Sequence, residues 1–464
     1  MPRYSIVITT VDRPAILKDC LAATLALERS DIEVLVSDNF SDERTAAVIE
    51  GFQDQRLRKF RTDRRMPMPD HWEWIWQQTR GDYVIYIGDD STLTEAALRA
   101  ADRAIDAYDA DIVSWRAAHY YHADWKVKFR HLPDRGNILA IDMGFSNGLY
   151  RVDTDAVIRH FCETLRLSGC FPSVIGFLVK RDIGNAVIRE TGRFHWAPCP
   201  DISASLMALV RAGQGRFYFW DGLGGLGGRS GDSNVASLLS KGKASKRLRE
   251  WLDEFPSGEE RFPDHPYALE SITNLLAAAI TQTKTHYPER FPDHYYDMQT
   301  LILRSIDDAY RDLTVPWADD ETFIAELESL IEGQAPAEQE AARASLESAR
   351  AELRAFIDSG GDHFNPTPDP QGTGLLDMAA ALAKDPDGRN RRLFMKTRRN
   401  PHNRYWNYAG STFIDMELFG SRTIHGARDA LPVILEEFEP DEPTFLPQYR
   451  QFGMLGDALE TLKP

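Results

Sequence analysis

Two adjacent carboxylates follow the clearest β-strand pattern of the chain. The segment YVIYIG at 83–88 is rich in β-branched and aromatic residues, and Asp89 and Asp90 come directly after it. Carboxylate oxygens are preferred ligands of hard divalent cations such as Mg²⁺, which also accept phosphate and water. An ion held there would neutralise the charge that grows on a departing diphosphate. An Asp beside a strand end is equally a good helix N-cap, so the pair alone does not decide between these roles.

Polar residues end two further strand patterns near the start of the chain. The run YSIVITT ends in two threonines and is broken by DRP, and the run IEVLVSDN carries an aspartate near its end. Neither run alternates apolar with polar residues, which is typical of strands buried on both faces of a parallel sheet. Ligands of such sheets bind beyond the carboxyl ends of the strands. We therefore expect one crevice to be lined by Thr9, Thr10, Asp12, Asp38, Asp89 and Asp90.

Strand and helix patterns alternate as far as residue 240, which predicts an α/β fold with a mostly parallel sheet flanked by helices. Beyond that point helical patterns dominate, and KGKASKRLRE at 241–250 has the composition of a surface helix or a linker. We predict a first domain at 1–240 and a mainly helical region at 241–464, which would serve acceptor binding, oligomerisation or docking. The helices expected there are Tyr267–Thr283, Asp297–Asp312, Thr322–Ile331 and Ala335–Ile357.

The order of segments over roughly residues 1–120 resembles family 2 glycosyltransferases of the GT-A fold. The matching segments are IVITT, EVLVSDNFSDE, RLRKFRTD and the helix MPDHWEWIWQQTRGDY that leads into YVIYIGDD. The resemblance implies inverting, metal-dependent transfer of a sugar from a nucleotide diphosphate sugar, with UDP favoured, to an acceptor hydroxyl in surface glycan biosynthesis. The implied partners are this donor and a glycan or lipid-linked acceptor.

The resemblance also assigns roles to single residues. Asp38 matches the carboxylate on the uracil or ribose side of the donor, and Asp89 matches the acidic residue near the ribose. Asp90 matches the ligand of Mn²⁺ or Mg²⁺, although Ser91 follows where many relatives carry another Asp. The turn with Thr9, Thr10 and Asp12 borders the nucleotide, and basic side chains that could meet the base or diphosphate are Arg61, Arg64 and Arg65.

A base is also needed, because the attacking acceptor hydroxyl must lose its proton. Asp201 in PCPD lies where the resemblance places a catalytic Asp, although an Asp that starts a helix is also a preferred N-cap. Upstream of it, His195 and Trp196 could form an acceptor wall or simply pack in the core. The Gly-rich stretch 221–234 lacks the apolar helix that a dinucleotide site needs. We predict a mobile loop there, with Arg229 and Ser230 as phosphate contacts; an ordinary flexible connection is the alternative.

Two clusters remain without an assigned chemistry. Trp72, Trp74 and Trp76 are expected to pack beneath the nucleotide site rather than stack on a sugar. The segment 389–406 holds seven basic residues among aromatics, whereas 251–360 holds 23 acidic and 8 basic residues. The leading hypothesis is that these two segments pair, and an anionic acceptor, a membrane surface or a partner protein are the alternatives.

The composition narrows the possible classes of function. The net charge of −17 disfavours nucleic acid as the main partner. Four cysteines without C-x-x-C spacing suit a reducing compartment. No signal peptide is recognised, and the longest apolar run, at 275–280, is too short to span a bilayer. We therefore expect a cytoplasmic enzyme, with a peripheral contact at the inner membrane face and homo-oligomerisation both open.

Two rival functions are open. One is a sugar nucleotidyltransferase, which is disfavoured because the turn TTVDRP lacks glycines. The other is a non-catalytic sugar-binding scaffold.

Overall fold

A computed structural model gives the three-dimensional structure of the chain. It describes residues 2–125, 136–141, 145–167, 169–173, 176–212, 215–231, 265, 267, 269, 271–291, 296–312, 321–358, 405–408, 411–438 and 459–461.

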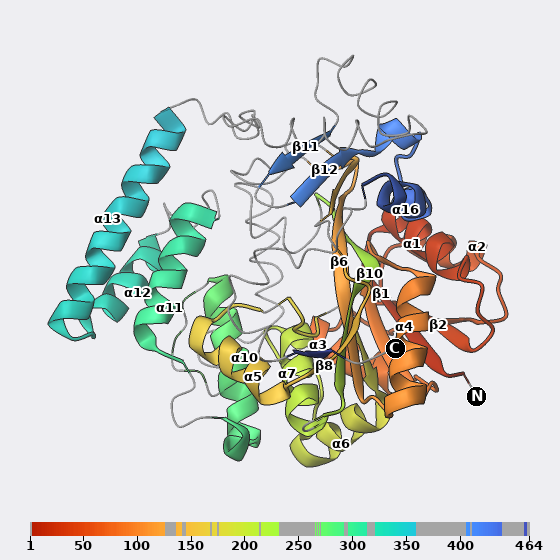
Figure 1. The fold of residues 1–464 in the computed structure, drawn as a ribbon, viewed down its shortest axis with the longest axis horizontal. Coiled ribbons are helices and arrows are strands. Elements are labelled where there is room, and N and C mark those ends of the chain that lie inside the picture. Colours follow the sequence, from red (N-terminus) through yellow and green to blue (C-terminus); the bar gives the residue numbers. More distant parts are fainter. Residues whose placement is uncertain are drawn as a thin grey trace.

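Four parallel strands form the first part of a single large sheet (Figure 1). They are β1 (Tyr4–Thr10), β2 (Ile32–Asp38), β3 (Leu57–Arg61) and β4 (Tyr83–Gly88). β1 lies between β2 and β4, with Thr10 opposite Asp38 and Thr9 opposite Gly88. The apolar runs expected to be strands are therefore strands, and their carboxyl ends lie at one edge.

Helices join these strands and cover the sheet on both faces. They are α1 (Pro14–Leu25), α2 (Glu43–Gly51), α3 (Met68–Trp76) and α4 (Glu95–Tyr108). Asp42 caps α2 by accepting a hydrogen bond from the Thr45 amide, and Thr94 caps α4 in the same way through the Ala97 amide. Two separate apolar cores result, one containing α1 and α4 and the other containing α3.

The second part of the sheet is mixed. β6 (Ile112–Tyr121) pairs antiparallel with β7 (Ile138–Ile141) and β9 (Phe177–Lys180), and β9 connects it to β4. β10 (Phe217–Arg229) runs parallel to β6 and also pairs with the short strands β5 (Thr92–Leu93) and β8 (Leu149–Val152). The helices α5 (Thr154–Thr164), α6 (Arg181–Thr191) and α7 (Pro200–Ala212) pack in the core that contains α3.

The expectation of a loop from residue 221 is wrong as far as residue 229, because this stretch is the second half of β10. Its glycines let the strand pass close to its neighbours: a Cβ on Gly224 would lie 2.1 Å from the Trp115 ring. A Cβ on Gly228 would lie 1.7 Å from the Asp90 carbonyl oxygen. Glycine therefore marks close backbone approach here rather than a mobile loop.

The helices expected beyond residue 240 are present. They are α10 (Ile272–His286), the 3₁₀ turn η2 (Pro288–Arg290), α11 (Met298–Ile306), the π-helical turn η3 (Asp307–Asp312), α12 (Glu321–Glu332) and α13 (Pro336–Asp358). α10 packs on α7, and α11 to α13 share a core of their own with the ends of β6 and β7. No described helix is long and apolar enough to cross a bilayer.

The last described segments return to the sheet of the first half of the chain. β11 (Tyr405–Tyr408) pairs with β12 (Ser411–Asp415), β12 pairs with β7, and β13 (Leu459–Thr461) pairs with β8. After the 3₁₀ turn η4 (Met416–Phe419), α16 (Ile424–Phe438) lies against α1 (Figure 1). The boundary predicted at 240/241 and the basic residues 389–404 lie outside the described residues, so both stay predictions.

Candidate functional site

The ends of β1 and β4 bring the first predicted site residues into direct contact. The Thr10 hydroxyl donates a hydrogen bond to Asp89 Oδ2 at 2.6 Å. Asp38 ends β2 on the other side of β1. Because neighbouring strands are ~4.8 Å apart, Asp38 lies at the same edge as Asp89 but separated from it by the width of β1. Thr9, whose neighbours in the sheet are Ser37 and Gly88, is half-buried at this edge.

A residue that the sequence analysis did not select holds the two adjacent carboxylates. The Arg13 guanidinium binds Asp89, reaches Asp90 Oδ2 at 2.7 Å and donates to the Ser230 hydroxyl at 2.5 Å. The Arg13 side chain is 12% exposed. Burial opposes its charge, but the two carboxylates outweigh this effect and raise the pKa of Arg13. The only sequence signal for Arg13 is its place just before Pro14, which opens α1.

Asp90 is fixed on all sides. Its Oδ1 accepts a hydrogen bond from the Ser91 hydroxyl at 3.0 Å, and the His122 ring contacts its carbonyl oxygen at 3.1 Å. Burial works to raise the pKa of Asp90, yet the charge of Arg13 prevails and the pKa is lowered. Asp90 therefore remains an anion that faces a cation.

Asp38 is buried, and both of its carboxylate oxygens are engaged. Oδ1 accepts from the Ser41 amide at 2.8 Å, and Oδ2 pairs with Arg61 at 2.8 Å. Arg61 also donates to the Ser41 carbonyl, so it clamps the turn that follows β2. Of the basic side chains expected near the base or diphosphate, Arg61 thus contacts a predicted nucleotide-binding residue directly.

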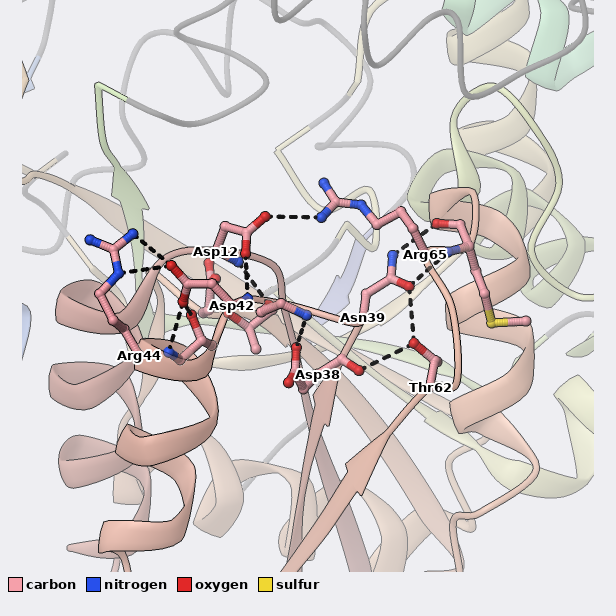
Figure 2. A network of polar contacts seen from close by, with 12 residues as sticks. Asp12, Asp38, Asn39, Asp42, Arg44, Thr62 and Arg65 are labelled. Atoms are coloured by element: carbon pink, nitrogen blue, oxygen red, sulfur yellow. Dashed lines mark hydrogen bonds and ion pairs between the residues drawn. The ribbon is translucent and has the colours of Figure 1, made fainter.

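Asp12 and Arg65 tie the turns after β1, β2 and β3 together. Asp12 Oδ2 pairs with Arg65 at 3.1 Å, and its Oδ1 accepts from the Asp42 amide at 2.9 Å. Asn39, one residue beyond β2, exchanges hydrogen bonds with the main chain of Met66. Figure 2 shows the direct contact between Asp12 and Arg65 and, beside it, the hydrogen bonds of Asn39.

Arg229 and Ser230 lie at the end of β10, beside the same edge. The Arg229 carbonyl accepts from the His122 amide at 2.9 Å, and Ser230 is the hydroxyl that Arg13 binds. The Arg229 Nε atom is buried and has no hydrogen-bond partner among the described residues. The structure therefore places Arg229 at the end of a strand near the residues around Asp90, and its contact with a phosphate stays a prediction.

Asp201 lies in the first turn of α7 and is partly buried. Burial raises the pKa of its carboxyl, against hydrogen bonds from nearby backbone amides and the Cys199 thiol. The charge of Asp201 also acts on His195, whose ring lies 5.1 Å from that of Tyr86 on β4. The ring contact places His195 beside β4, the strand that Asp89 follows.

His195 and two of the tryptophans, Trp72 and Trp76, are core residues. His195 is 1% exposed and contacts the rings of Trp72 and Trp76, which are also buried. Trp74 is half-buried and lies edge-on to Phe60 of β3. Packing beneath the sheet edge is thus confirmed for Trp72 and Trp76. Trp196 is half-buried and lies against His286 of α10 rather than in this cluster.

The N-terminal part of the chain is similar in sequence to known proteins. A model described as glycosyl transferase family 2 matches residues 5–164. A Campylobacter jejuni protein named GalNAc(5)-diNAcBac-PP-undecaprenol beta-1,3-glucosyltransferase is 27% identical over 101 residues, which cover 21% of this chain and 33% of that protein. The chain therefore matches about a third of the length of that relative.

Solved structures of S. aureus TarS are also similar. The fragment 1–349 in complex with UDP-GlcNAc is 12% identical with a TM-score of 0.43, over 78% of this chain and 92% of that one. A longer TarS structure is 16% identical with a TM-score of 0.38, over 65% of this chain and 52% of that one.

The family match spans β1 to α5 and includes the strand ends that carry Thr10, Asp38, Asp89 and Asp90. Residues 5–164 therefore match a domain of glycosyl transferase family 2, and the strands and helices that they form have an α/β arrangement.

Proposed function

We propose that the chain is an inverting, metal-dependent glycosyltransferase that moves a sugar from a nucleotide diphosphate sugar, of the UDP type, to an acceptor hydroxyl. The convergence of Thr10, Asp38, Asp89 and Asp90 at one edge of a family 2 domain is the observation that carries this proposal. The Campylobacter jejuni relative is named for glucosyl transfer to a PP-undecaprenol-linked glycan. We therefore extend the proposal to glycan or lipid-linked acceptors in surface glycan biosynthesis.

The donor would lie across the carboxyl edge of β1, β2 and β4. Asp38 and Arg61 face the side on which the nucleoside would bind, and Asp12 with Arg65 border it. Arg13 and Arg229 supply positive charge next to Asp90, where the diphosphate would lie. Guanidinium groups suit this task because their planar forks match phosphate oxygens.

The residues present fit a divalent ion that arrives with the donor. Among the described residues no group of three or more His, Cys, Asp or Glu could enclose a metal by itself. Mg²⁺ is commonly held by one or two carboxylates together with substrate phosphates, which is what Asp90 and the donor would provide. For this, Arg13 would have to release Asp90 Oδ2. A bound Mn²⁺ or Mg²⁺ would neutralise negative charge on the departing diphosphate.

Asp201 is the proposed general base. It would accept the proton of the acceptor hydroxyl while that oxygen attacks the anomeric carbon and the bond to the diphosphate breaks. The raised pKa of its partly buried carboxyl makes it a better proton acceptor than a solvent-exposed Asp. The neighbouring Cys199 thiol and backbone amides would hold the carboxylate in place.

A panel of nucleotide-sugars tests the function. The full chain would be incubated with each donor, with glycan and lipid-linked acceptors, and with Mn²⁺, Mg²⁺ or EDTA. We expect metal-dependent release of nucleoside diphosphate and an inverted anomeric configuration in the product. Tight UDP binding by calorimetry without turnover of any donor would instead favour a non-catalytic scaffold.

A further inference from the structure

A second carboxylate lies behind the proposed base and has no role in the function proposed above. Glu73 is on α3, which packs against α7, the helix whose first turn contains Asp201. Its side chain is 13% exposed, and its neighbours on α3, Trp72 and Trp76, are buried. A carboxylate in such surroundings is costly unless its oxygens find hydrogen-bond donors.

One oxygen of Glu73 collects three donors from a single segment. Oε2 accepts from the amides of Phe194 and His195, both at 3.0 Å, and from His195 Nδ1 at 3.3 Å. Because a carboxylate only accepts hydrogen bonds, this contact places a ring proton on Nδ1. Hydrogen bonds from His195 and the two amides overcome the effect of burial and lower the pKa of Glu73.

The segment that Glu73 holds leads directly to the base. The Trp196 amide donates to the Ser203 hydroxyl at 2.9 Å, and the Ala197 carbonyl accepts from Gln282 of α10 at 2.6 Å. Residues 194–197 are therefore anchored by α3, α7 and α10, four residues before Asp201. The other oxygen of Glu73, Oε1, is buried and has no hydrogen-bond partner among the described residues. A buried oxygen without a donor is uncommon and calls for a functional explanation.

We propose, resting on the function above, that Glu73 is a positioning residue for catalysis: through the 194–195 amides and the His195 ring it holds Asp201 at the acceptor. The His195 ring contacts Glu73 and also feels the charge of Asp201. Glu73 therefore acts on Asp201 by fixing the segment that leads to it.

The test compares Glu73→Gln with Asp70→Asn in the full chain. Asp70 lies one turn earlier on α3 and pairs with Arg193 of the same segment, but at the surface. For Glu73→Gln we expect kcat to fall roughly 10- to 100-fold, the scale of a small displacement of a catalytic group, with the donor KM changed less than about twofold. For Asp70→Asn we expect wild-type kcat within about twofold.

The outcomes separate the two proposals. A wild-type protein that turns over no donor overturns the proposed function. A wild-type enzyme that is active, together with a Glu73→Gln variant of equal kcat, overturns the role of Glu73 alone. UDP binding by calorimetry checks folding: a variant that binds UDP as the wild type does but loses kcat supports positioning. If Glu73→Gln fails to bind UDP, Glu73→Asp is measured, and a normal kcat with this shortened side chain counts against the proposal.

Discussion

The carboxylates at the sheet edge and the carboxylate of Asp201 have opposite electrostatic surroundings. Asp89 and Asp90 are buried next to one another, and the Arg13 guanidinium lies against both. Asp201 is partly buried as well, but its hydrogen-bond donors are a thiol and backbone amides rather than a cation. Accordingly the pKa of Asp90 is lowered and the pKa of Asp201 is raised. The same side chain can therefore serve as a permanent anion in one place and as a proton acceptor in another, according to its neighbours.

The largest effect is expected at the proton acceptor. Asp201→Asn should lower kcat by about 10²- to 10⁴-fold, the usual contribution of a general base, while UDP binding measured by calorimetry stays unchanged. The substitution should not lower the urea midpoint of unfolding, because it removes a charge that burial disfavours. Transfer at the wild-type rate would show that Asp201 is not the base. The functional contrast between Asp201 and Asp90 would then be wrong.

The next effect is expected at the guanidinium. Arg13→Gln leaves Asp89 and Asp90 buried without their cation, so the free energy of unfolding should drop by about 3–5 kcal/mol in urea titrations. Added Mn²⁺ should restore more stability to this variant than to the wild type, because the ion can then bind Asp90 without competition from Arg13. Equal stabilisation of both proteins by Mn²⁺ would argue against a cation site at Asp90.

A smaller effect concerns pH. Because the pKa of Asp201 is raised, kcat/KM should fall as the pH drops through a value above the ordinary 3.8 of an Asp. Below that value the carboxyl is protonated and cannot accept the acceptor proton. A profile that stays flat down to pH 4 would show that no base with a raised pKa controls the reaction. The residual activity of Asp201→Asn should lack this limb.

The smallest effect is expected at the exposed rim of the site. Arg65 and Asp12 form an ion pair in which both side chains are close to half exposed. Arg65→Ala should change the free energy of unfolding by less than about 1 kcal/mol. UDP binding, measured by calorimetry, should weaken measurably if Arg65 borders the donor. Unchanged UDP affinity would show that the donor does not bind beside the Asp12–Arg65 pair.

Local sequence patterns were sufficient to predict the edge of the sheet. Each of the first four apolar runs forms a strand. The polar residues that end these runs are the ones whose side chains meet at the edge of the sheet. Asp38, Asp89 and Asp90 could be placed in this way because neighbouring parallel strands share their direction.

Contacts between distant segments could not be predicted. Arg13 lies in the turn after a strand. Its role depends on contacts with two carboxylates that are 76 and 77 positions away in the sequence. Glu73 looks like a surface residue of α3 until Phe194 and His195 fold back onto it. The glycines from Gly222 to Gly228 predicted a loop because the sequence does not reveal that β10 must pass beside Trp115 and Asp90.

The return of the last strands limits how this chain can be divided. β12 supplies the outer partner of β7, and α16 covers apolar residues of β6, β7 and β10. A fragment that ended at residue 240 would leave the backbone groups of β7 open to other chains, and exposed edges of this kind promote aggregation. Expression of the N-terminal half alone should therefore give insoluble protein, whereas the full chain should stay monodisperse in size-exclusion chromatography.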